Sequence, residues 1–220
     1  MARQRRLLLP GLAHLLSLPA LAGVQPFPAA ADRARFLDLL RDAAAAETVQ
    51  VHAYALLPSE VRLLATPANE AGLSRLVQGL GRRYVSAYNR EHDRAGTLWS
   101  GRFRCAAVEP GAWALSALRY VDAASAEPGF TSAAMRCGGA RRWPLADPVE
   151  YWQLGNTPFE RESTYAGLLA EPLPDAHASR LQRCLIGGWF FGNPAFVARL
   201  GTASQRSLSP RPRGRPARPQ

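Results

Sequence analysis

At 220 residues the chain is long enough for one domain of ordinary size with appendages, and such a domain can bury a sound core without disulfides. No apolar run reaches the ~18 residues that a membrane span needs, so the sequence argues against a membrane protein. The formal net charge of +10 favours a polyanionic partner. Every basic residue is Arg, whose planar guanidinium binds phosphate with two parallel hydrogen bonds better than the ammonium of Lys does. A GC-rich genome also explains the absence of Lys.

The cysteines and the N-terminal segment bear on the compartment. The three cysteines are odd in number and widely spaced, without a C-x-x-C pair, which favours a reducing cytoplasm. The N-terminal segment nevertheless imitates a secretory signal, with a basic start, an apolar stretch from Leu7 to Leu21 and small residues before Asp32. Two prolines and His14 interrupt that stretch. We therefore expect a cytoplasmic protein and keep a signal peptide as the alternative.

Helical and strand patterns alternate from residue 31 onward. Residues 31–46 carry apolar side chains at helical spacing, with Asp32 as the predicted N-cap. Val49 to Leu57 and Val61 to Ala65 are apolar runs separated by Pro58, which predicts a β-hairpin. Residues 73–88 show an amphipathic helical pattern with a basic flank, residues 102–108 predict a strand, and residues 113–121 predict a helix that carries Tyr120.

Composition divides the chain into four predicted segments. Residues 1–126 form the principal domain, and residues 127–160 form an irregular connector rich in Pro and Gly. Residues 161–201 form a small helical module. Residues 202–220 form a disordered Arg/Pro tail without apolar periodicity.

The segment from Val51 to Leu64 carries a family resemblance. It reads V-H-A-Y-A-L-L-P-S-E-V-R-L-L and closely resembles two strands of the HUH single-tyrosine transposases, specifically the IS200-like REP-associated tyrosine transposases, where V-H-A-Y-x-L-M-P-N-H-V-H-L-L is typical. The blocks G-L-S-R, G-R-R-Y-V and G-T-L-W-S-G-R-F-R within residues 72–104 also resemble this family. The resemblance places the opening strand and turn at Arg6 to Gly11. The resulting order of strands and helices is the ferredoxin-like split βαβ pattern, an α+β fold with an antiparallel sheet.

The resemblance implies a catalytic site that this chain has altered. In the family two histidines hold one divalent ion, Mg²⁺ or Mn²⁺, and a tyrosine attacks the DNA phosphate and becomes joined to it. Glu60 and Arg62 stand at the positions of the two histidines, and Ala124 stands where a third ligand is expected. A guanidinium offers no lone pair and repels a cation, so we expect no metal cofactor and an ion pair between Glu60 and Arg62. Tyr120 is then a vestigial nucleophile or a packing residue.

Two histidines outside the former ligand positions, His52 and His14, need separate interpretations. His52 matches the histidine of the V-H-A-Y run, and we expect it to be a satisfied core or edge residue of the scaffold. His14 is isolated from the other histidines in sequence. The alternative that His14 and Glu60 meet in space and form a metal site stays open.

Basic and aromatic residues interleave in the blocks that resemble the family best. Arginines that hold phosphates, together with rings that stack on bases, suit single-stranded or hairpin DNA. The tail run R-P-R-G-R-P resembles an AT-hook, whose thin backbone lies in the minor groove of AT-rich duplex. The predicted DNA-binding residues are Arg82, Arg83, Tyr84, Arg102, Arg104, Arg213 and Arg215. The alternative is that these side chains form only a solvated helix face and strand edge.

These features together predict a DNA-binding protein of the transposase family from a bacterial mobile element. The ancestral activity that the resemblance implies is metal-dependent nicking of single-stranded DNA and strand transfer through a phosphotyrosine link. Because Glu60 and Arg62 replace the metal-binding histidines, we expect cleavage to be absent or greatly reduced while binding persists. The alternative is a non-enzymatic adaptor, or a decaying transposase copy without a role in DNA binding.

Overall fold

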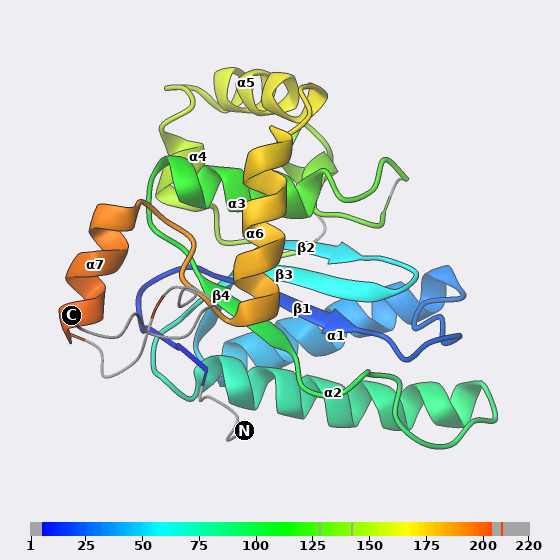
Figure 1. Ribbon diagram of the computed structural model, residues 1–220. Helices are drawn as coiled ribbons and strands as arrows, with labels where there is room; N and C mark the ends of the chain where they lie inside the picture. Colours follow the sequence, from blue (N-terminus) through cyan, green and yellow to red (C-terminus); the bar gives the residue numbers. More distant parts are fainter. Residues whose placement is uncertain (1–5, 128, 142, 204–207, 209–220) are drawn as a thin grey trace, which may run out of the picture.

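The computed structural model describes residues 6–127, 129–141, 143–203 and 208, and a four-stranded antiparallel sheet lies at its centre (Figure 1). The strands follow the order β2-β3-β1-β4 across the sheet. Their bounds are β1 His14–Pro19, β2 Val49–Leu56, β3 Glu60–Pro67 and β4 Arg104–Ala107. With α1 Ala30–Ala46 between β1 and β2, and α2 Gly72–Glu91 between β3 and β4, this is the ferredoxin-like split βαβ topology. The predicted α+β fold class is confirmed.

The opening strand lies further along the chain than predicted. The prediction placed it at Arg6 to Gly11, but β1 begins at His14 and pairs with both β3 and β4. A strand at the centre of a sheet with both faces covered is a continuous apolar run, and Leu15, Leu16 and Leu18 are all buried. Such a run has no period of two to mark it as a strand. The segment before it ends in a turn at Gly11, whose φ is +76°.

One face of the sheet is covered by α1 and α2. The core on this face includes alternate strand residues such as Leu16 and Leu63, together with Phe36 from α1 and Leu80 from α2. The apolar stripe predicted for α2 therefore packs inward. Asp32 is not the N-cap of α1, which is Ala29; its carboxylate accepts a hydrogen bond from the backbone N–H of Ala29 at 3.1 Å.

The other face of the sheet is covered by α3 Ala112–Asp122 and by elements from the C-terminal part of the chain (Figure 1). Leu15 and Leu64 from the sheet share a buried cluster with Leu118 of α3, Tyr165 of α5 and Leu181 of α6. Residues on both sides of the predicted boundary at 126 thus contribute to one core. The remaining elements are the 3₁₀ turn η1 Ala133–Arg136, α4 Val149–Trp152, α5 Pro158–Ala170, α6 Asp175–Gly187 and α7 Pro194–Ala203.

The connector protects the free edge of β2. The backbone N–H of Leu56 donates to the carbonyl of Phe130 at 2.7 Å, and that of Ser132 donates to the carbonyl of Tyr54 at 3.0 Å. These bonds satisfy backbone groups that an edge strand otherwise leaves open to pairing with another chain. His52 lies on the same strand, buried, with Nε2 2.8 Å from Thr66 Oγ1, in keeping with its expected scaffold role. None of the helices in the described ranges combines the length and apolar character required to cross a bilayer.

Candidate functional site

Glu60, Arg62 and Tyr120 converge on the sheet face that carries α3. Glu60 and Arg62 are two residues apart on β3, so both side chains point to the same face. The Nε of Arg62 donates to Oε1 of Glu60 at 2.6 Å, and the predicted ion pair is therefore present. The guanidinium carbon lies 4.6 Å from the centroid of the Tyr120 ring, within the range of a cation–π contact. The ion pair lies against the ring of the tyrosine.

Ser17 completes this arrangement from the neighbouring strand. Its hydroxyl is buried and donates to Oε2 of Glu60 at 2.8 Å. Both carboxylate oxygens of Glu60 therefore have a partner, one from β3 and one from β1. Ser17 was not among the residues predicted from the sequence. The available signal was a single hydroxyl inside the apolar run Leu15 to Leu18.

The side chains at this site do not fit a divalent cation. Arg62 places a positive guanidinium at a position where the sequence resemblance implies a metal ligand, and that group has no lone pair to donate. Glu60 is engaged by Arg62 and Ser17, and the methyl group of Ala124 is no ligand. Across the described ranges, no group of three or more His, Cys, Asp or Glu residues is arranged to hold a metal ion.

The environment of Tyr120 favours the neutral phenol. Burial raises the pKa of Tyr120, Arg62 opposes this by favouring the phenolate, and Glu60 adds to the increase. A tyrosine acts as a nucleophile through its phenolate, so a raised pKa reduces its reactivity at neutral pH.

His14 and Glu60 do not meet. In the pairing of β1 with β3, His14 lies opposite Ala65 whereas Glu60 lies opposite Pro19, at the other end of the strand pair. Nδ1 of His14 is 2.8 Å from the carbonyl of Leu12, and Nε2 accepts a hydrogen bond from the N–H of Leu9 at 3.1 Å. Burial lowers the pKa of His14 to about 4. His14 is thus a neutral structural residue, and the alternative metal site with Glu60 is wrong.

Arg104 lies on the same face as the Glu60 to Arg62 pair. Ser17 is paired with Arg62 on one side and with Arg104 on the other, and residues directly opposite each other in antiparallel strands share a face. Arg104 is exposed, as is Arg102 just before β4. These two predicted DNA-binding arginines belong to the β4 side of the sheet, and Arg104 shares the row of Ser17 and Arg62.

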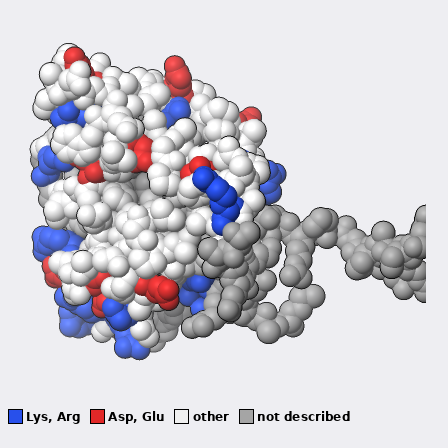
Figure 2. Space-filling view, turned by 90° about the vertical axis from the view of Figure 1, so that its left-hand side faces the viewer, with Lys and Arg blue, Asp and Glu red and all other residues white. Residues whose placement is uncertain are grey.

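Arg82 and Arg83 lie on α2, on the opposite face of the sheet (Figure 1). With Arg35 and Arg90 they line a groove of about 470 Å³ between α1 and α2. Arg83 is 3.6 Å from Asp42, so part of its charge is balanced. Figure 2 shows basic side chains gathered low on the visible face, at the height of α2, interspersed with acidic ones. The predicted DNA-binding residues are therefore divided between two surfaces.

Tyr84 requires a correction. It was predicted to contact DNA, but its side chain is completely buried and its ring packs edge-on against Phe36, with centroids 5.0 Å apart. Its hydroxyl donates to the carbonyl of Pro26 at 2.5 Å. A ring enclosed by the core is not available to stack on a base. Arg213 and Arg215, the predicted contacts of the tail, lie outside the described residues.

A buried polar network next to the site was not apparent in the sequence. Asp122, two residues after Tyr120, accepts hydrogen bonds from Ser132 at 2.5 Å, Tyr165 at 2.8 Å and Arg136 at 3.0 Å. Arg136 is completely buried and also donates to the backbone carbonyl of His52. The network joins the end of α3 to the connector and to α5. Its members are far apart in sequence and form no motif.

The fold and the site define a ferredoxin-like α+β domain in which a helix places a tyrosine over two charged residues of a central strand. No family model matches the chain, and no curated protein matches it. Among solved structures, the chain is similar to a REP-associated tyrosine transposase bound to a REP hairpin, with 14% sequence identity, a TM-score of 0.46, and coverage of 55% of this chain and 70% of that chain. It is also similar to a candidate transposase from Deinococcus radiodurans R1, with 22% identity, a TM-score of 0.38, and coverage of 50% and 88%.

Proposed function

We propose that this chain is a diverged member of the REP-associated tyrosine transposase family that binds DNA and no longer cleaves it. The observation that carries the proposal is the ion pair of Glu60 and Arg62 against the ring of Tyr120. The sequence blocks that resemble the family support the ancestry. The geometry of the three side chains supports the loss of cleavage.

The loss of cleavage follows from the charges at the site. A dication neutralises charge as it develops on the scissile phosphate, and this effect supplies much of the catalysis in metal-dependent phosphoryl transfer. Arg62 supplies positive charge, but Glu60 already balances it, and the pair offers no coordination site. With the pKa of Tyr120 raised by burial, attack by a phenolate is also disfavoured.

Retention of DNA binding is supported by the exposed arginines. Arg104 is exposed on the same sheet face as the site, and Arg102 is exposed just before β4. Among the described residues, no ion pair involves either arginine. The net charge of +10 adds a general attraction to phosphate. We infer a single-stranded or hairpin partner at this face and AT-rich duplex at the tail through Arg213 and Arg215. Because bacterial DNA lies in the cytoplasm, we infer that a protein with this partner acts there.

Binding is tested by fluorescence anisotropy with labelled hairpin DNA in EDTA, over a series of salt concentrations. Wild-type protein should bind without a divalent cation, and its affinity should fall with salt by a slope of ~0.9 per phosphate contact. Arg104→Ala should weaken binding and reduce that slope by about one contact. Arg41→Ala, which removes an exposed arginine paired with Asp38 on α1, is the control. Absence of binding at low salt would favour the adaptor or relic.

Cleavage is tested with the same hairpin DNA in Mg²⁺ or Mn²⁺. The expected result is no covalent protein–DNA adduct and no nicked strand. An adduct that disappears in Tyr120→Phe would show that the nucleophile still works and would overturn the proposed loss of cleavage. Because this assay is separate from the binding assay, each half of the proposal can fail without the other.

A further inference from the structure

The groove between α1 and α2, called the arginine groove below, lies on the sheet face away from α3 and has a volume of about 470 Å³. Four arginines line it, Arg35 from α1 and Arg82, Arg83 and Arg90 from α2. Ser86 adds a hydroxyl, and none of the described residues that line the groove is acidic. The proposed site on the α3 face uses none of these side chains.

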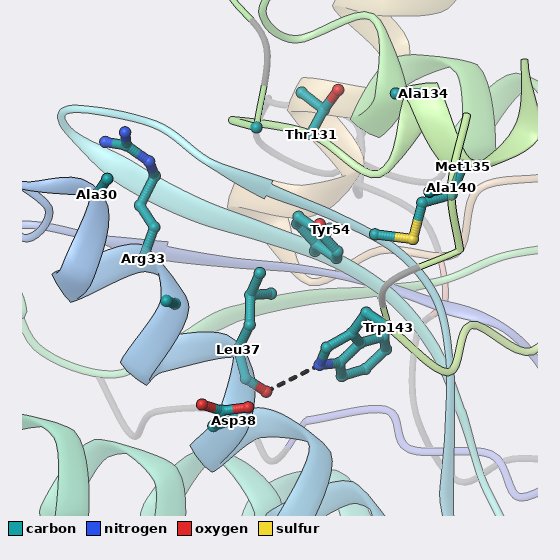
Figure 3. Close-up of a pocket in the computed structure, with 12 residues that line it drawn as sticks. Ala30, Arg33, Leu37, Asp38, Tyr54, Thr131, Ala134, Met135, Ala140 and Trp143 are labelled. Carbon is teal, nitrogen blue, oxygen red and sulfur yellow. Dashed lines mark hydrogen bonds between the residues drawn. The ribbon is translucent and has the colours of Figure 1, made fainter.

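Helix α1 forms a fixed wall of the arginine groove. Arg35 lies on the groove side, whereas Leu37 lies on the other side, where its backbone carbonyl accepts a hydrogen bond from Nε1 of Trp143 at 2.9 Å (Figure 3). A hollow of about 620 Å³ on that side is walled by Tyr54 and Trp143, and both rings belong to the buried core. Those rings are therefore not available to a ligand, whereas the arginines that α2 contributes to the groove are exposed.

The arginine groove carries positive charge that its neighbours do not balance. Arg35 is paired with Glu91 at 2.8 Å, and Arg83 is 3.6 Å from a carboxylate on α1. Arg82 and Arg90 are exposed, and among the described residues no ion pair involves either of them. Exposed ion pairs contribute little to stability, so a phosphate can replace the carboxylate at Arg35 or Arg83 at small cost. A guanidinium binds phosphate through two parallel hydrogen bonds.

The two unpaired arginines are aligned along α2. Arg82, Ser86 and Arg90 follow one another at intervals of four residues, so they lie on one face of the helix. At a rise of 1.5 Å per residue, Arg82 and Arg90 are about 12 Å apart along the helix axis. The hydroxyl between them is a further donor to phosphate. This row offers separate contacts to several phosphates of one backbone, not a pocket for a single anion.

The arginine groove offers phosphate contacts without base contacts. Tyr84 and Tyr88 lie on the same helix, but both rings are buried, and no aromatic ring is among the described residues that line the groove. Proteins that hold a single strand without sequence preference stack its bases on accessible rings. Phosphate contacts alone suit duplex DNA, whose bases are enclosed, and they carry no sequence information directly.

We propose that the arginine groove binds the backbone of duplex DNA irrespective of its sequence, so that one chain holds two DNA segments, one on each face of the sheet. The sheet and a layer of helices separate the groove from Arg104, so one straight duplex cannot contact both surfaces. This inference rests on the proposed DNA binding at the α3 face and adds a second site. An acidic protein is the alternative ligand, and the experiment distinguishes it.

The arginine groove is tested by fluorescence anisotropy with a labelled GC-rich duplex, which the predicted AT-hook tail does not favour. Arg82→Ala and Arg90→Ala should each weaken binding roughly five- to tenfold near 0.1 M salt and reduce the salt slope by about one contact. Arg75→Ala is the matched control, because Arg75 is an exposed arginine of the same helix, paired with Glu47 and outside the groove. All three arginines are exposed, so their substitution leaves the core intact.

Removing a carboxylate beside the groove should have the opposite effect. Glu91→Gln frees Arg35 from its ion pair and should tighten binding of the GC-rich duplex and increase the salt slope. Glu47→Gln frees Arg75 outside the groove and is the control, with binding close to that of wild type.

The second DNA segment is tested in a sandwich assay. Hairpin DNA is immobilised, protein is bound to it, and the capture of labelled GC-rich duplex is measured. Wild type and Arg75→Ala should capture the duplex. Arg82→Ala/Arg90→Ala should load onto the hairpin to the same level and capture at least about tenfold less duplex.

The outcomes separate this inference from the proposed function. If the groove variants match Arg75→Ala in both assays while Arg104→Ala weakens hairpin binding, the groove is not a DNA site and the proposed function stands. If Arg104→Ala has no effect and the groove variants lose the hairpin as well, DNA binds only in the groove, and both the proposed face and the two-segment inference are wrong. Displacement of the duplex by poly-glutamate as readily as by unlabelled duplex would overturn the assignment to DNA. Absence of all DNA binding would overturn both proposals.

Discussion

The guanidinium of Arg62 lies against the ring of Tyr120 while its Nε donates to Glu60. One cation therefore contacts both the carboxylate of Glu60 and the aromatic ring of Tyr120. The arrangement is self-contained, because Ser17 takes the other carboxylate oxygen of Glu60. The positive charge at this site is supplied by Arg62, which is part of the polypeptide, and not by an ion bound from solution.

Introducing two histidines at positions 60 and 62 should create a metal site. In Glu60→His/Arg62→His, two imidazoles two residues apart on β3 would point to the same face and could share one ion. We expect this variant to bind Mn²⁺, measured by isothermal titration calorimetry and by electron paramagnetic resonance, while wild type and Glu60→Gln/Arg62→Gln do not. Equal Mn²⁺ binding by wild type would contradict the interpretation of the site.

Arg62 and Glu60 should shift the titration of Tyr120 in opposite directions. Arg62 lowers the pKa of Tyr120 and Glu60 raises it, against a larger increase caused by burial. Arg62→Met should therefore raise the pKa further, and Glu60→Gln should lower it. The measurement is the alkaline ultraviolet difference spectrum, with the contribution of Tyr120 identified by subtracting that of Tyr120→Phe. A pKa unchanged in both variants would show that the ion pair does not act on the phenol.

Stability should fall as the pH drops from 6.5 to about 4. Burial lowers the pKa of His14 from 6.5 to about 4, so in this window the unfolded chain binds a proton that the folded chain does not. Below both pKa values, the difference in proton affinity of His14 lowers the free energy of unfolding by about 3 kcal/mol. Protonation of Nε2 would also remove the acceptor for the N–H of Leu9. Burial lowers the pKa of His52 too, which acts in the same direction.

The readout for His14 is the free energy of unfolding from urea titrations across this pH range. His14→Gln should have a shallower dependence on pH than wild type, whatever its stability at neutral pH. The same slope in both proteins would mean that His14 does not remain neutral in the folded state.

Breaking the buried network around Asp122 and Arg136 should strongly reduce the free energy of unfolding. Arg136 is completely buried between Asp122 and Asp147. Its removal leaves the buried carboxylate of Asp122 without its cation, whereas Asp147 keeps its ion pair with Arg141. Arg136→Met should reduce the free energy of unfolding by about 3–5 kcal/mol, the range for a broken buried ion pair. Arg41→Met, which breaks an exposed pair with Asp38, should cost at most ~1 kcal/mol. Urea denaturation measures both, and a comparably small cost at Arg136 would contradict the structural role of the network.

Several elements were predictable because their signal is local. The hairpin of β2 and β3 follows from two apolar runs on either side of Pro58, and α2 follows from its apolar stripe. That stripe also included Tyr84, so the helical period already indicated its burial and argued against its assignment to DNA. The position of β1 was missed because a central strand has no alternation. The pairing of the connector with the edge of β2 could not be predicted, because it depends on backbone hydrogen bonds that leave no pattern in the sequence.

The sequence by itself determined that a guanidinium stands at position 62 and that it shares a direction with Glu60, because both follow from residue chemistry and from the two-residue period of a strand. Only the tertiary structure decided that Ser17 and Tyr120 meet this pair, and that Arg104 lies on its face of the sheet while Arg82 and Arg83 lie on the other. These contacts join strands and helices far apart in the chain. They depend on the register of the sheet and on which face each helix covers, and neither is fixed by local residue spacing.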